Sequence, residues 1–93
     1  MGNDAAKSII LELVNEILGN GVLTKNNYKD NLGEYGLDSL TMIMLVSELE
    51  RRFQCVIPDS KMEYSKMNTM EKIYNLVEEV LAGEQETLTK RKI

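Results

Sequence analysis

The sequence predicts an all-α fold: a small four-helix bundle of three longer helices and one short helix, with a long loop between the first two helices. Three stretches carry apolar residues at helical spacing, and the segments between them lack that period. A chain of 93 residues can bury one modest core but not two. We therefore expect one domain over residues 1–82, followed by a flexible polar tail over residues 83–93.

The first helix is predicted over residues 4–18, where one face is apolar. That face contains Ala6, Ile9, Ile10, Leu13, Val14 and Ile17. Residues 19–38 show no sustained period, and so long a connection in a compact domain is usually either functional or poorly ordered. Five side chains are spaced to hold this loop on the core: Val22, Leu23, Tyr28, Leu32 and Tyr35. The loop is long enough for the first two helices to run either parallel or antiparallel.

The second helix is predicted from Ser39 to Phe53, with Asp38 as its N-cap. The Asp38 carboxylate can accept hydrogen bonds from the free N–H groups of the first turn, and it faces the positive end of the helix dipole. After this helix, Ile57 and Pro58 force an extended exit, because the residue before a proline disfavours helical geometry.

Two capping patterns predict the remaining helices. Ser60 to Glu63 fits a capping box and indicates a short third helix of one or two turns. The segment Asn68-Thr69-Met70-Glu71 caps the last helix in a similar way, and we expect that helix to end near Ala82. From Gly83 onward the chain is polar, which is typical of a frayed tail.

Composition excludes several classes of function. The formal charge is −4, from 11 basic and 15 acidic residues, which argues against nucleic acid and favours basic partner proteins. No apolar run approaches the ~20 residues that a membrane span requires, so no membrane partner is expected. We also expect the chain to be a monomer. Cys55 is the only cysteine, which fits a reducing cytoplasm. Asp30, Glu34 and Asp38 recur every fourth residue, but nearby glycines argue against a helix, so no metal site is expected.

The second helix has two apolar faces. Met42, Leu45, Val46, Leu49 and Phe53 form the stripe that should face the bundle. On the other side, one turn from Ser39, lies a second strip that we interpret as a partner-binding surface, made of Leu40, Ile43, Met44, Ser47 and Arg51. Scattered exposed apolar residues are common, however, and Arg51 and Arg52 also suit the negative end of the helix dipole.

Ser39 is the candidate functional residue. The chain contains no histidine, so neither a Ser-His-Asp nor a Cys-His arrangement can be built. No catalytic residue is therefore assigned, and the chain is not expected to be an enzyme. We interpret the Ser39 hydroxyl as a group that another enzyme modifies.

The motif Gly36-Leu37-Asp38-Ser39-Leu40 opens an apolar helix that closes on Glu50-Arg51-Arg52-Phe53 and is followed by Ile57-Pro58. This pattern resembles the acyl carrier protein family over residues 4–82. The resemblance implies a 4′-phosphopantetheine arm on Ser39, attached from coenzyme A by a phosphopantetheinyl transferase that recognises Asp38, which would make the chain a phosphoprotein.

The resemblance also implies a function and its partners. The arm would hold acyl groups as thioesters and present them to loading ligases or transferases and to synthase enzymes. Carriers of bacterial fatty-acid synthesis usually have a strongly acidic second helix, which Met44, Ser47, Arg51 and Arg52 dilute here. Residues Tyr35 to Ser39 look closer to carriers of polyketide or related assembly lines.

Two alternatives stay open at this point. One is a peptidyl or aminoacyl carrier, although such carriers commonly have two glycines before the Asp-Ser pair, and Leu37 stands in the second position here. The other is a helical adaptor in which Ser39 is an unmodified first-turn residue. The sequence does not determine the cargo or the pathway; Met1 mildly favours a discrete protein over a domain of a larger synthase.

Overall fold

Helices account for all the regular structure in the part of the chain that is described. The computed structural model describes the backbone of residues 2–19 and 21–91, and the side chains of residues 5–19 and 21–83. It contains the α-helices α1 (Gly2–Leu18), α2 (Ser39–Phe53) and α3 (Met70–Arg91). Four 3-10 turns lie between them: η1 (Lys25–Asn27), η2 (Leu32–Tyr35), η3 (Asp59–Lys61) and η4 (Tyr64–Lys66). The predicted all-α bundle is confirmed.

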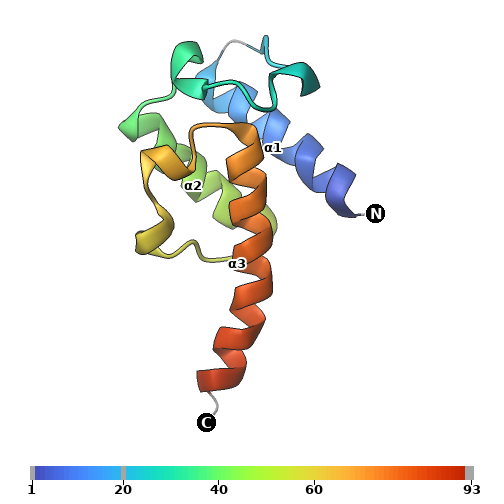
Figure 1. The fold of residues 1–93 in the computed structure, drawn as a ribbon, viewed down its shortest axis with the longest axis vertical. Coiled ribbons are helices and arrows are strands. Elements are labelled where there is room, and N and C mark those ends of the chain that lie inside the picture. Colours follow the sequence, from blue (N-terminus) through green and yellow to red (C-terminus); the bar gives the residue numbers. More distant parts are fainter. Residues whose placement is uncertain (1, 20, 92–93) are drawn as a thin grey trace.

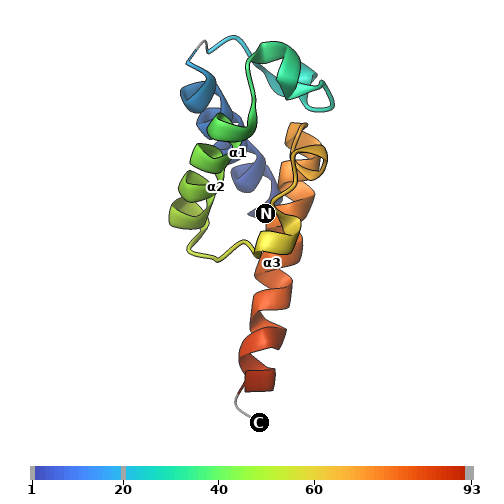
Figure 2. The same ribbon diagram turned by 90° about the vertical axis from the view of Figure 1, so that its left-hand side faces the viewer.

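The three α-helices enclose one core. α1 packs against both α2 and α3, and it runs in the opposite direction to them (Figures 1 and 2). Of the two directions that the loop length allowed, the antiparallel one is therefore found. The core is entirely apolar, since no polar or charged residue is buried among the residues described. Its fully buried side chains include Ile10, Leu13, Leu45, Leu49 and Ile73.

The long loop is held against the helices at its start. Leu23 is buried, and the Asn15 side chain of α1 binds its backbone on both sides, accepting from Leu23 N and donating to Leu23 O at 3.0 Å each. The expectation for Val22 was wrong, because its side chain is 60% exposed. With Leu23 pointing into the core, an extended backbone turns the preceding residue outward.

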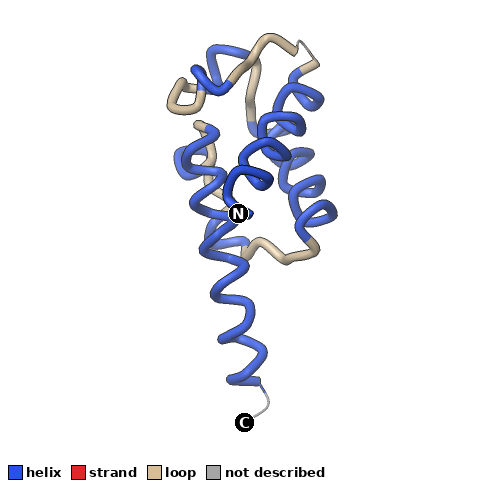
Figure 3. Tube along the Cα trace, turned by 90° about the vertical axis from the view of Figure 1, so that its right-hand side faces the viewer, coloured by secondary structure: helices blue, strands red, loops and turns tan. Residues whose placement is uncertain are grey.

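The rest of the loop is tied to the start of α3. Glu71 N donates to Tyr28 O at 3.0 Å, and Leu32 N donates to Asn68 O at 2.8 Å. Leu32 is fully buried and Tyr28 is half-buried. The tan loop above the helices in Figure 3 is thus a docked segment, as the sequence predicted.

The short third helix has a different form from the one predicted. Two 3-10 turns, η3 and η4, replace a continuous helix, and the Ser60–Glu63 capping box does not form. Met62 and Met67 both pack against the core. Residues five apart lie about 140° apart around an α-helix, so a straight helix would turn one of them away. The break between η3 and η4 lets both methionines face inward.

The last helix begins as predicted and ends later. Thr69 caps it, with its Oγ1 accepting from Lys72 N at 3.1 Å. α3 then continues to Arg91 instead of ending near Ala82. A single glycine, Gly83, costs a helix only about 1 kcal/mol relative to alanine, and most of the residues after it are good helix formers. The flexibility expected for residues 83–93 stays a prediction.

No helix in the described residues is long and apolar enough to cross a membrane.

Candidate functional site at the start of α2

A buried turn fixes the backbone immediately before α2. Gly36 ends η2 with φ +110°, a left-handed conformation that glycine adopts without strain. Leu37 follows with its side chain in the core, 4% exposed, and its N–H donates to Leu32 O at 3.1 Å. The next residues, Asp38 and Ser39, therefore leave the core at a defined point and in a defined direction.

Asp38 caps α2, as predicted, but it does so together with Thr41. Asp38 Oδ1 accepts from Thr41 N at 2.9 Å, and Asp38 N donates to Thr41 Oγ1 at 2.8 Å. Thr41 Oγ1 also donates to Asp38 Oδ1 at 2.9 Å. The two bonds that the carboxylate accepts, first from the backbone and then from the side chain of Thr41, hold the pKa of Asp38 below its ordinary value of 3.8. The carboxylate beside Ser39 is therefore ionised at neutral pH.

Ser39 is the first residue of α2, and its side chain is exposed. No hydrogen bond among the described residues engages its Oγ. The hydroxyl is accessible at a helix N-terminus, where the helix dipole favours a negatively charged group, although the Asp38 carboxylate partly opposes it. This arrangement can accept a covalent phosphodiester without rearrangement of the core.

The predicted partner-binding strip of α2 is exposed. The exposed fractions of its apolar members are 68% for Leu40, 56% for Ile43 and 47% for Met44. Ser47 and Arg51 are also exposed, and Arg51 pairs with Glu48 one turn earlier. The opposite stripe lies in the core and includes Met42, Leu45, Val46 and Leu49. α2 thus presents two apolar faces, and the binding of partners to the outer one stays a prediction.

Two residues that support the site were missed from the sequence. Thr41 was detectable, since the spacing Asp-x-x-Thr is a variant of the capping box. No sequence pattern indicated Tyr64, because it belongs to η4, which follows α2 in the chain and is distant in sequence from Leu37. Its hydroxyl donates to Leu37 O at 3.0 Å, and a Cβ on Gly33 would clash with that hydroxyl. Tyr64 therefore packs against the turn that leads into Ser39.

Comparison with protein families agrees with this geometry. A family model described as "Phosphopantetheine attachment site" matches residues 8–77, most of the chain. The chain belongs to this family. Membership in the phosphopantetheine attachment-site family makes it a carrier domain, consistent with an acyl carrier protein, and gives it 4′-phosphopantetheine as its prosthetic group. A search of curated proteins returned no match.

The residues at the start of α2 fit that prosthetic group. Ser39 offers an exposed hydroxyl for the phosphodiester, and the buried side chain of Leu37 holds the backbone before it against the core. When bound, the group supplies a terminal thiol that forms thioesters. No cluster of potential metal ligands occurs in the described part of this carrier domain.

Proposed function

We propose that Ser39 carries the 4′-phosphopantetheine group and that the domain holds acyl groups on it as thioesters for partner enzymes. The observation that carries the proposal is the exposed Ser39 hydroxyl on the first residue of a capped helix. In this role the domain has no catalytic activity of its own, because its partners supply the catalytic groups. Its contribution is to raise the effective concentration of the tethered acyl group at each partner's active site.

Two partner contacts follow from this role. The ionised Asp38 carboxylate, next to the attachment residue, is a recognition point for the phosphopantetheinyl transferase. The strip formed by Leu40, Ile43, Met44, Ser47 and Arg51 is the docking face for loading and synthase enzymes. Its apolar centre would be desolvated on docking, and apolar anchors of this kind dominate the energetics of many interfaces.

We further propose an acyl cargo and a role in polyketide or related biosynthesis. The support is the sequence Tyr35-Gly36-Leu37 before the Asp-Ser pair and the reduced acidity of α2. Arg51 pairs with Glu48, and Arg52 lies 3.4 Å from Glu12 of α1, so part of the acidic charge is neutralised within the domain. An aminoacyl carrier is the alternative.

Intact-mass measurement after incubation with coenzyme A and a broad-specificity phosphopantetheinyl transferase tests the attachment residue. The wild-type chain is expected to gain the mass of one phosphopantetheine group, and Ser39→Ala to gain none. Ser60→Ala is the matched control, since Ser60 is an exposed serine on η3, outside the proposed docking face. An unchanged wild-type mass, or modification that persists in Ser39→Ala, would refute the assignment.

The loaded domain then tests the cargo. An acyltransferase is expected to charge the thiol with an acyl group, while an amino-acid-activating ligase leaves it free. The reverse result would overturn the acyl assignment and establish the aminoacyl alternative, without affecting the attachment residue.

A further inference from the structure

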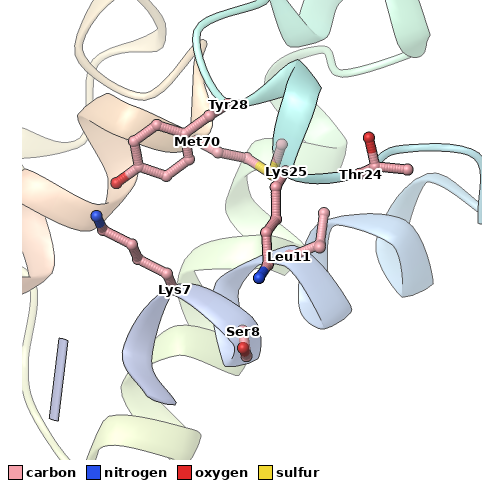
Figure 4. A pocket seen from close by; sticks show the side chains of 7 residues that line it. All are labelled: Lys7, Ser8, Leu11, Thr24, Lys25, Tyr28 and Met70. Atoms are coloured by element: carbon pink, nitrogen blue, oxygen red, sulfur yellow. The ribbon is translucent and has the colours of Figure 1, made fainter. Parts of the chain in front are cut away.

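A cavity of about 400 Å³ lies away from α2. It opens to solvent and is lined by three elements: α1, the loop around η1, and the start of α3. Figure 4 shows its lining residues, which are Lys7, Ser8, Leu11, Thr24, Lys25, Tyr28 and Met70. None of them belongs to α2 or to the turn before Ser39. The cavity is therefore separate from the site described above.

The lining combines an apolar floor with two positive charges. Met70 is buried, Leu11 is half-buried, and the Tyr28 ring forms an aromatic wall. Lys7 and Lys25 lie on opposite sides of the space in the view of Figure 4. Cavities of about 300–1,000 Å³ with mostly apolar walls and a few fixed polar groups are typical of small-molecule sites.

Neither lysine of this cavity has a carboxylate within 4.0 Å among the described side chains. Every other described basic side chain lies within 4.0 Å of a carboxylate or donates to a backbone carbonyl. Lys7 and Lys25 have no such partner among the described side chains. The two acids that act on Tyr28 each have another partner, since Glu71 lies 4.0 Å from Lys29 and Glu78 accepts from the Tyr74 hydroxyl at 2.8 Å.

Aromatic rings hold one of the two cations in place. Lys7 Nζ lies 5.3 Å from the centre of the Tyr28 ring and 5.1 Å from that of Tyr74. These distances allow cation–π attraction, which fixes the ammonium group at the cavity without neutralising its charge. Burial, with Glu71 and Glu78, raises the pKa of Tyr28, so its phenol stays neutral and can donate a hydrogen bond.

We propose that this cavity binds a small amphiphilic anion, a carboxylate or phosphate attached to an apolar body. The apolar body would lie on Leu11 and the Tyr28 ring, which are both half-buried, and the anionic group between Lys7 and Lys25. A neutral ligand would leave both ammonium groups unpaired, and inorganic phosphate would leave the apolar floor exposed. The ligand would bridge α1, η1 and α3, adding to the hydrogen bond between Tyr28 O and Glu71 N that already ties the loop to α3.

NMR titration of the unmodified chain with octanoate, octyl phosphate, 1-octanol and inorganic phosphate tests the proposal. Octanoate and octyl phosphate are expected to shift the amide signals of Leu11, Thr24 and Tyr28. Both should bind at least about tenfold more tightly than octanol or phosphate, because charge-assisted hydrogen bonds are worth more than neutral ones. The stronger of the two anions identifies the preferred headgroup.

Substitution of one cavity lysine tests whether its charge holds the anion. Lys25→Gln is expected to weaken octanoate binding about tenfold, whereas the control Lys66→Gln, on η4, leaves it unchanged. The Ser39→Ala variant should bind like the wild type, so the result is independent of the attachment proposal. Absence of binding, equal binding of octanol, or equal affinity in Lys25→Gln would each overturn the inference.

Discussion

The hydrogen bond from the Tyr64 hydroxyl to Leu37 O connects η4 to the turn before Ser39. Removing it should lower the free energy of unfolding of the domain by a measurable amount. Tyr64→Phe deletes only the donor and leaves a partly buried carbonyl without its partner. A single hydrogen bond of this kind contributes about 0.5–1.5 kcal/mol to the free energy of unfolding. For a domain of this size, 1 kcal/mol corresponds to a fall in Tm of about 4–8 °C.

Urea denaturation and thermal melting, each followed by circular dichroism, measure this loss. Tyr28→Phe is the matched control, because the Tyr28 hydroxyl makes no hydrogen bond among the described residues and its ring keeps its contact with Lys7. The amide signals of Asp38 and Ser39 should also shift in Tyr64→Phe and not in Tyr28→Phe. Equal stability of the two variants would refute the anchoring role of Tyr64.

Gly33 makes the same argument testable by a double-mutant cycle. An alanine Cβ at Gly33 would clash with the Tyr64 hydroxyl but only touch the ring, at 3.6 Å from Cζ. Gly33→Ala should therefore destabilise the wild type by about 1 kcal/mol, through loss of the same hydrogen bond, and cost less in the Tyr64→Phe background. The Asn31 Oδ1 atom, 3.2 Å from the new Cβ, is crowded in both backgrounds and cancels in the cycle. Additive effects of the two substitutions would contradict the structure.

Two further predictions concern residues beside Ser39. Because the folded-state pKa of Asp38 is lowered, its ionised carboxylate stabilises the fold fully above pH 3.8 and loses this contribution as the pH falls through the folded-state value. Asn also caps helices well, so the urea midpoint of Asp38→Asn should match that of the wild type at about pH 6. At about pH 3 the variant should have lost less stability than the wild type. Urea midpoints that fall in parallel with pH in the two proteins would contradict this. Leu40→Glu should change Tm by no more than about 2 °C, because Leu40 is 68% exposed. It should, however, slow transfer of an acyl group to a partner synthase at least about tenfold. Val56→Glu, at another exposed position, is the control, and equal transfer rates in the two variants would argue against the docking face.

The helices and the exposed position of Ser39 at the start of α2 were predictable because local sequence determines them. The bounds of α2 and its Asp38 cap follow from a side chain placed before a run of apolar residues at helical spacing. The exposed outer strip of Leu40, Ile43 and Met44 follows from the same spacing. These features need no information about the rest of the fold.

The features that were wrong or missed depend on contacts between distant segments. Val22 and Leu23 are both apolar, and the hydrogen bonds between the Asn15 side chain of α1 and the Leu23 backbone help to fix which of them turns inward. Similarly, the core has room for both Met62 and Met67, which breaks the predicted third helix into η3 and η4. Local capping preference cannot overcome the burial of two large side chains.

The position of Tyr64 gives these non-local contacts a functional meaning. In the role proposed for Ser39, the hydroxyl must be accessible, and a fixed backbone before it would keep it in the same place for successive partners. The buried side chain of Leu37 holds this backbone against the core, and the Tyr64 hydroxyl holds it from η4 by donating a hydrogen bond to the Leu37 carbonyl. A partner that displaced η4 would free this carbonyl and loosen the turn before Ser39. Contact of a partner with η4 would therefore reach the turn before Ser39 through the hydrogen bond between Tyr64 and Leu37.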